Sequence, residues 1–307
     1  MTEFKIKFRG VRGSHPVASG NFLKYGGNTS CVEVDIDGRL IILDAGTGLI
    51  NLGDELMQGY INSGTTLSNR KPVRATILFS HIHQDHIMGL PFFAPLHVAS
   101  TQLHVFGSPV NGGNLEEELS ETLFNKTFPL DAGDIAADVV CYDINETNYI
   151  IIKKDLSTVL MNVCDYMNSK HSDDDVVISC YKSYAHPQNG VLIYRIEYKG
   201  KSLVYATDKE SYIGGDVKLA KFARGCDCLI HDTQYTTEDY QSLYSPKQGF
   251  GHSTFDMAKE VLQQTKAGKL VCFHYDPKYS DEKLDMISED FADENLIFAK
   301  EGLEIIL

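Results

Sequence analysis

Short hydrophobic runs recur along the chain, each bounded by glycine or polar residues, and this pattern predicts a series of strands. Residues 4–8 alternate between apolar and polar side chains, as in a half-buried strand. Residues 31–36 and 40–43 flank Asp37 and Gly38, a strong signal for a hairpin turn. Residues 73–79 are apolar and β-branched enough to predict a buried strand. The first quarter of the chain therefore predicts a sheet of short, mostly buried strands.

The second half of the chain continues this pattern. Residues 191–198 and 202–207 predict a hairpin around Lys199 and Gly200, and residues 227–235 predict a buried strand that ends in polar groups. Residues 270–273 predict another buried strand. The expected helices begin near residue 49 and residue 116 and cover 255–265 and about 282–291, and a last strand is expected over 303–307.

Composition places the chain among soluble globular proteins, with 43% apolar and 23% charged residues in 307. The formal net charge of −14 argues against a general nucleic-acid or anionic-membrane surface, because basic fields bind phosphate backbones. It does not exclude a small anionic substrate bound by cations. The first residues have no long apolar core, and no stretch reaches the roughly 18 apolar residues of a membrane span. The odd number and scattered spacing of the seven cysteines indicate reduced thiols, so we expect a cytoplasmic protein. A monomer and a homodimer are both compatible with the sequence.

Four side chains of metal-ligand type follow the strand over 73–79. The stretch from Ser80 to Gly89 reads S-H-I-H-Q-D-H-I-M-G, so the chain must turn as it leaves the sheet. Imidazole and carboxylate groups bind Zn²⁺ and similar ions, and this loop carries more of them than one tetrahedral ion needs. It therefore suggests two ions side by side. The competing interpretation is a solvated polar loop, which is disfavoured because three of the 11 histidines fall within six positions. The four candidate ligands are His81, His83, Asp85 and His86.

The H-x-H-x-D-H loop resembles that of the metallo-β-lactamase superfamily. Three earlier segments resemble its ribonuclease Z-like and cyclic-phosphodiesterase branch: G-V-R-G-S-H-P over 10–16, Y-G-G-N-T-S-C-V-E-V over 25–34, and L-D-A-G-T-G over 43–48. The resemblance implies an α/β fold, a four-layer αββα sandwich of two mixed sheets flanked by helices. Its site would lie at strand ends along one edge of the sandwich. The resemblance implies that Asp44 contacts the metal ligands without binding a metal itself, and so holds the metal loop in place.

The resemblance also extends to residues in the second half of the chain. His186 stands in Ala-His-Pro just before the predicted hairpin, and Asp208 stands in Tyr-Ala-Thr-Asp just after it, so both fall at strand ends. The alternative for Asp208 is a helix N-cap. The implied ligands are His81, His83 and His186 for one ion, Asp85, His86 and His274 for the other, and Asp208 as the bridge between them. Zn²⁺ and Mn²⁺ both suit this set. A hydroxide between two such ions would be the nucleophile, and Asp85 would help to orient it.

Protonation of a leaving group requires a separate acid. The branch uses a histidine in G-H-S-T, which this chain has over 251–254, and so the resemblance assigns the acid to His252. The partner segment reads His-Asp-Thr-Gln over 231–234, with Asp232 where the branch has glutamate. We expect Asp232 to orient His252. The alternative for His252 is a structural histidine at a helix end.

We expect one domain over 1–307, because no repeat, low-complexity run or linker interrupts the chain. The branch usually has fewer residues between its metal loop and the hairpin, so an insertion is expected near 145–180, at the mouth of the site. Strand-like runs at 149–152 and 176–179 lie within it. The 145–180 region is also expected to help form the pocket walls, together with the loop that contains Ser108.

Three functions compete. The first is a metal-dependent hydrolase, a phosphodiesterase that cleaves a small cyclic or linear phosphodiester. The second is a tRNA 3′-processing ribonuclease of the ribonuclease Z type. The acidic chain disfavours it, and the tight hairpin between His186 and Asp208 has no room for a long basic arm. The third is a non-catalytic sensor or partner-binding protein on the same fold, which the complete ligand set disfavours. A true lactamase is less well supported, because an aspartate bridge replaces the cysteine ligand that those enzymes often use.

Overall fold

Two mixed β-sheets form the centre of the computed structural model, which describes residues 4–110, 112–124, 128–212 and 214–307. Within these residues the strands form a seven-stranded sheet in the order β15-β1-β2-β3-β4-β5-β6 and an eight-stranded sheet in the order β14-β13-β12-β11-β10-β9-β7-β8. The first sheet contains β1 (Phe4–Gly10), β2 (Cys31–Ile36), β3 (Arg39–Leu43), β4 (Arg74–Leu78), β5 (Gln102–Gly107), β6 (Asp138–Asp143) and β15 (Glu304–Ile306). The second contains β7 (Asn148–Ile152), β8 (Thr158–Asn162), β9 (Val176–Ser183), β10 (Val191–Tyr198), β11 (Lys201–Ala206), β12 (Cys228–Asp232), β13 (Lys269–Phe273) and β14 (Leu296–Phe298).

Strand direction changes within each sheet. In the first sheet β15, β1, β2 and β3 pair antiparallel, and β3 to β6 pair parallel. In the second sheet β8, β7, β9, β10 and β11 pair antiparallel, and β11 to β14 pair parallel. The two hairpins that the sequence predicted, β2–β3 and β10–β11, are both present. The parallel strands deliver the ends of consecutive segments to the same edge of the sandwich.

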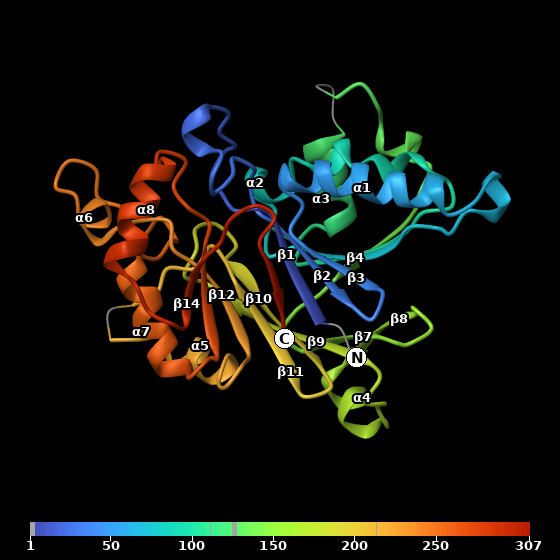
Figure 1. The fold of residues 1–307 in the computed structure, drawn as a ribbon. Coiled ribbons are helices and arrows are strands. Elements are labelled where there is room, and N and C mark those ends of the chain that lie inside the picture. The colour runs from blue at the N-terminus through green and yellow to red at the C-terminus, as the bar shows by residue number, and fades with distance from the viewer. Residues whose placement is uncertain (1–3, 111, 125–127, 213) are drawn as a thin grey trace.

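Helices cover the outer face of each sheet (Figure 1). α1 (Gly48–Asn62) and α3 (Leu115–Leu123) lie over the first sheet, and α5 (Val217–Phe222), α7 (Phe255–Thr265) and α8 (Asp281–Asp290) lie over the second. The shorter helices are α2 (Gln84–Ile87), α4 (Val163–Asn168) and α6 (Thr237–Tyr240), with 3₁₀ turns η1 (Gly20–Phe22), η2 (Leu67–Asn69), η3 (Leu90–Phe92), η4 (Ala94–His97) and η5 (Ala132–Asp134). This arrangement is the αββα sandwich that the resemblance implied.

Local capping explains why α7 matches its predicted bounds. The Thr254 hydroxyl accepts a hydrogen bond from the Met257 backbone N–H at 3.1 Å. Such a cap contributes about 1 kcal/mol and defines the first turn. At the other end Lys266 adopts a left-handed conformation, with φ of 53°, and this conformation ends the helix.

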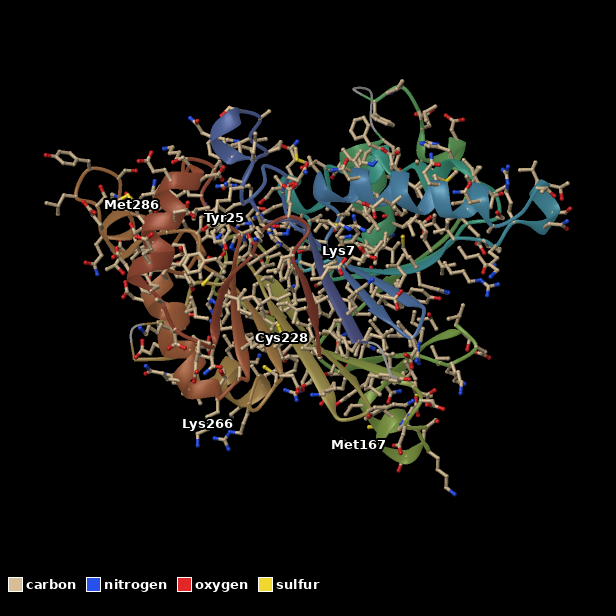
Figure 2. The ribbon with its side chains drawn as sticks, viewed as in Figure 1. Lys7, Tyr25, Met167, Cys228, Lys266 and Met286 are labelled. Atoms are coloured by element: carbon tan, nitrogen blue, oxygen red, sulfur yellow. The ribbon has the colours of Figure 1, made fainter. Side chains whose placement is uncertain are left out.

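The hydrophobic core has two main parts. The larger part joins the facing sides of both sheets and includes Val34, Tyr194 and Phe273, all fully buried. The smaller part lies between the first sheet and its helices and includes Leu49, Val105 and Leu115. Cys228 lies inside the second sheet (Figure 2) and is buried. All seven cysteines are free.

The 145–180 region forms one edge of the second sheet. β7 and β8 pair there as a hairpin, and α4 follows at the end of the molecule opposite α2 (Figure 1). Met167 on α4 projects from that end and is 69% exposed (Figure 2). Tyr166 stacks on Tyr149, with ring centroids 4.0 Å apart, which fastens α4 to β7. The expected insertion therefore extends a sheet edge; its effect on the pocket walls is described with the site.

Among the described residues, no helix is both long and apolar enough to cross a membrane.

Candidate metal centre

The histidine loop lies between the end of β4 and α2, where the two sheets meet. The Leu192 backbone N–H donates to the Ser80 carbonyl at 2.8 Å, and the Tyr194 hydroxyl donates to the Phe79 carbonyl at 2.7 Å. These bonds connect the start of the loop, which follows the first sheet, to β10 of the second sheet. The loop is therefore held at a shared edge, and His86 on α2 is completely buried.

Three strands end in residues with the same unusual backbone conformation. Asp44 follows β3, Asp208 follows β11, and His274 follows β13, with φ of 59°, 49° and 66°. Non-glycine residues rarely adopt positive φ, and such residues cluster at functional sites because the surrounding structure must compensate for the strain. Here the conformation ends each strand and turns a polar side chain into the space between the sheets. The alternative role of Asp208 as a helix N-cap is not observed, since Asp216 caps α5.

Asp44 organises the loop from behind, as the resemblance implied. Its carboxylate accepts from the Ser80 N–H and hydroxyl, both at 2.7 Å, and from the Tyr205 hydroxyl at 2.8 Å. His86 Nδ1 lies 2.8 Å from Asp44 Oδ2, so Nδ1 carries the proton that it donates. The other nitrogen, Nε2, is directed into the site, where a bound cation would take the place of its proton. The roles of Ser80 and Tyr205 were not predicted from the sequence, although Ser80 begins the metal-loop motif and Tyr205 lies in the Tyr-Ala-Thr-Asp segment.

One group of ligand atoms collects around His86. Donor atoms from Asp85, His86, Asp208 and His274 all lie within 4.8 Å of one another. Asp208 Oδ1 is 3.1 Å from Nε2 of both His86 and His274, and Asp85 Oδ2 is 3.3 Å and 3.2 Å from the same two nitrogens. The Ser14 N–H donates to Asp85 Oδ2 at 2.7 Å. We call Asp85, His86 and His274 the anchored group.

The loop between β1 and β2 packs directly on this group, a contact that was not predicted from the sequence. A side chain at Gly13 would place its Cβ 2.4 Å from the His274 ring. Only glycine fits such a close approach. Gly13, the second glycine of the G-V-R-G-S segment, thus lets the backbone bring the Ser14 N–H to Asp85.

A second group of donor atoms lies beside the first. It consists of three histidines whose ligand atoms lie within 4.8 Å of one another. His186 Nδ1 donates to the Gly251 carbonyl at 3.1 Å, and its Nε2 lies 3.0 Å from His83 Nδ1. His81 Nδ1 lies 3.1 Å from the Ser80 hydroxyl, whose own proton goes to Asp44. We call His81, His83 and His186 the open group, because His83 is only partly buried.

His81 provides the clearest sign that these residues suit a cation. Its Nε2 is buried and has no hydrogen-bond partner among the described residues. Leaving a buried polar atom unpaired costs about 1–3 kcal/mol, so such atoms call for an explanation. A lone pair directed at other lone-pair donors and a carboxylate is what a divalent ion requires. The residues present therefore fit the metal that the fold family implies.

Charge supports the same conclusion. Burial alone would lower the pKa of His86, but the carboxylates of Asp208, Asp85 and Asp44 raise it well above its usual range. His274 behaves alike, with a pKa raised to about 10 by Asp208 and its neighbours against the effect of burial. By contrast, burial lowers the pKa of His186 to about 4. So many buried carboxylates need positive charge nearby, which bound cations supply.

His252 and Asp232 are in direct contact. His252 Nδ1 donates to Asp232 Oδ2 at 2.8 Å, and Asp232 Oδ1 accepts from the Ser253 N–H at 2.9 Å. Burial would raise the pKa of Asp232, but the charge of His252 and its hydrogen bonds lower it to about 2. The shorter aspartate thus reaches the imidazole although the branch has glutamate there. The His252 ring stacks on His274, with centroids 5.1 Å apart.

Two cavities adjoin the open group. One, of 130 Å³, is lined by His81 and His83, and a more open one, of 360 Å³, is lined by His186. The walls include Ser108, as expected, but no described residue of 145–180 lines either cavity. The expectation that this region forms the pocket wall is therefore wrong, because β7 and β8 extend the far edge of the sheet. A larger cavity, of 600 Å³, lies under α3 and is lined by none of the candidate ligands.

Comparison with known proteins agrees with the geometry. Residues 39–275 match a family model described as the beta-lactamase superfamily domain. A ribonuclease Z from Picrophilus torridus is 26% identical over 305 residues, covering 92% of this chain and 88% of that protein. The metallo-beta-lactamase fold protein YhfI from Bacillus subtilis matches at a TM-score of 0.65 with 16% identity, covering 100% of both chains. A diphosphatase from the PhnP family matches at 0.62 with 16% identity, covering 98% and 97%. Since the family match extends from β3 beyond His274, the chain belongs to the beta-lactamase superfamily, and it is a hydrolase of the metallo-β-lactamase fold.

Proposed function

We propose that the protein is a phosphodiesterase that cleaves a small cyclic or linear phosphodiester at a centre of two divalent ions. One observation carries the proposal. Asp208 lies between the two groups of donors, with Oδ1 3.1 Å from His86 and His274 and Oδ2 3.7 Å from His81 and 3.8 Å from His186. A carboxylate with one oxygen toward each group is suited to bridge two cations. We assign one ion to the open group and one to the anchored group, as Zn²⁺ or, with the same ligands, Mn²⁺.

Bound ions of this kind lower the pKa of a coordinated water and offset the charge that develops on a phosphoryl group. The protein's own residues would position and protonate. Asp85 is held by the Ser14 N–H, so its carboxylate keeps one orientation and can also orient the attacking water. His252 would donate a proton to the leaving oxygen through Nε2. Asp232 fixes the other nitrogen and stabilises the charged imidazole.

Processing of tRNA 3′ ends is the second candidate, and the ribonuclease Z relatives favour it. Two features weigh against it. The net charge is −14, which disfavours a large nucleic-acid surface. β10 ends at Tyr198 and β11 begins at Lys201, so this hairpin carries no arm. The first experiment must therefore distinguish tRNA 3′-end processing from hydrolysis of a small phosphodiester.

The test combines metal analysis with a substrate panel. Protein reconstituted with Zn²⁺ or Mn²⁺ should contain two ions per chain and hydrolyse bis(p-nitrophenyl) phosphate and a cyclic nucleotide. Cleavage of a pre-tRNA without turnover of the small diesters would replace the proposal by the ribonuclease function. Full metal occupancy with no hydrolysis of any substrate would favour the non-catalytic alternative. One ion or none after reconstitution would contradict the dinuclear centre.

A further inference from the structure

A lysine lies beside the open group in a crevice that the proposed reaction does not use. Lys182, on β9, lines the cavity of 130 Å³ together with His81 and His83. Residues 187–190, which lead into β10, lie on the same side as Lys182, and the loop after β5, including Ser108, forms the other wall. The crevice therefore opens between the two sheets, directly next to one proposed ion.

The walls of the crevice are held together by hydrogen bonds between the sheets. Lys182 Nζ donates to the Ser108 hydroxyl at 2.9 Å, and the Asn189 amide donates to the Pro109 carbonyl at 2.6 Å. Gln188 lines the same space and has φ of 64°, a strained conformation for a residue with a side chain. Side chains with hydrogen-bonding groups thus face the crevice from both walls.

Lys182 forms no ion pair, unlike other lysines of the chain. Lys209 pairs with Asp216, and Lys218, which also donates to the Lys182 carbonyl, pairs with Glu146 at 3.1 Å. Lys182 has no Asp or Glu oxygen within 4.0 Å among the residues that the structure describes. Burial lowers its pKa, and the charge of Glu118, which raises it, does not offset burial. The Glu118 carboxylate accepts from the Val110 N–H at 2.7 Å and 2.8 Å instead of pairing with Lys182. No acidic residue lines its crevice, whereas Glu210 lines the neighbouring cavity and three glutamates line the cavity under α3. In a chain of net charge −14, this crevice stands out as a place suited to an anion.

We infer that the crevice is a subsite for a second phosphate of the substrate, one that is not cleaved, and that Lys182 is its binding residue. The inference rests on the proposed function, because the phosphodiester would occupy the ions and place its next phosphate beyond His81 and His83. Lys182 would bind that phosphate as a point charge, with the hydroxyl and amide groups of Ser108 and Asn189 nearby. The substrate class is then a diester that carries an additional phosphate monoester.

A matched pair of substrates tests this subsite. Thymidine 5′-(p-nitrophenyl phosphate) and its 3′-phosphorylated form share the same scissile bond and leaving group. The metal-loaded protein should prefer the 3′-phosphorylated form through a lower KM. In Lys182→Met this preference should fall about 10- to 100-fold, in KM rather than in kcat, as expected for a charge-assisted hydrogen bond. Lys182→Arg should retain part of it.

Lys247 provides the control. Its Nζ also donates to a serine hydroxyl, that of Ser245 at 3.0 Å, and it too is only partly buried, but it does not line the crevice. Lys247→Met should therefore keep the preference for the 3′-phosphorylated substrate. Equal KM values for the two substrates in the wild type would overturn the inference. An equal loss of preference in both lysine variants would overturn it as well.

A binding measurement separates the subsite from catalysis. Thymidine 3′,5′-bisphosphate and thymidine 5′-monophosphate are titrated into the metal-loaded protein by calorimetry. The bisphosphate should bind about 10-fold or more tightly than the monophosphate, and Lys182→Met should remove the difference. If the wild type hydrolyses neither nitrophenyl diester but binds the bisphosphate more tightly than the monophosphate, the proposed function fails and the subsite stands. If it hydrolyses both without such a preference in binding, the subsite fails alone.

Discussion

The anchored and open groups are built from the same side chains but are supported differently. In the anchored group, His86 donates to the Asp44 carboxylate, and His274 Nδ1, which makes no hydrogen bond among the described residues, faces the Asp232 carboxylate at 3.4 Å. In the open group, the corresponding nitrogens of His81 and His186 meet a serine hydroxyl and a backbone carbonyl. A carboxylate behind an imidazole makes it a more basic and better oriented ligand. For the two proposed ions, the comparison predicts that the anchored group would hold its ion more firmly than the open group, which adjoins both cavities.

Replacement of the residue shared by both groups should have the largest effect. Two cations a few ångströms apart repel each other, and Asp208 is the carboxylate that would lie between the two proposed ions. Asp208→Ala should lose an ion and nearly all hydrolysis, measured by elemental analysis and by turnover of bis(p-nitrophenyl) phosphate. Asp256→Ala, an exposed acid on α7, serves as the control and should change neither. Two retained ions with activity near wild type would show that the groups do not depend on this bridge.

Removal of the proposed acid should come next in size and should affect neither group of ligands. His252 stacks on His274 of the anchored group and lies edge-on to His186 of the open group, with centroids 5.2 Å apart. His252→Ala should keep both ions and lower turnover of a nucleotide or alkyl diester by about 10²–10⁴-fold. Turnover of the p-nitrophenyl diester should fall far less, because nitrophenolate leaves without a proton. Equal losses on both substrates would mean that His252 binds phosphate instead, and no loss would return it to a structural role.

A change behind one group should then separate the two ions. Asp44→Asn keeps the size of the side chain but removes the charge that orients His86. The affinity of the anchored ion should fall about 10- to 100-fold, and that of the open ion should fall less. Competition with a chelator, monitored as two dissociation steps, measures both constants. In the wild type the open ion should leave first; release of both ions in one step, or equal weakening in the variant, would contradict the comparison.

The smallest effect is expected at Asp232, whose carboxylate accepts from His252 and lies 3.4 Å from His274 of the anchored group. Asp232→Asn should reproduce the substrate pattern of His252→Ala more weakly, because the imidazole remains but loses its charged partner. The ratio of kcat values for alkyl and nitrophenyl diesters measures the effect. A variant that loses a metal ion while that ratio stays unchanged would assign Asp232 to the support of His274 alone.

The sequence predicted correctly those features that depend only on residues close together in the chain. The four candidate ligands from His81 to His86 share one loop, and the Asp37-Gly38 turn requires only its own backbone. The bounds of α7 follow from its cap at Thr254. These features could be predicted because the forces that produce them act between neighbours in sequence. The family resemblance extended this reach to His186, Asp208 and His274, which the structure brings to the same edge.

Contacts between distant segments were decided only by the tertiary structure. Asp232 reaches His252 across 20 residues because β12 and the segment before α7 meet at the end of the second sheet. The 145–180 region joins a sheet edge away from the site, since β7 pairs with β9. The crevice beside Lys182 forms because β9 of the second sheet faces the loop after β5 of the first sheet. By itself the sequence determined which chemical groups the protein has and most of its local elements. The packing of two sheets decided which of those groups meet, because such contacts depend on strand pairing and burial that neighbouring residues do not specify.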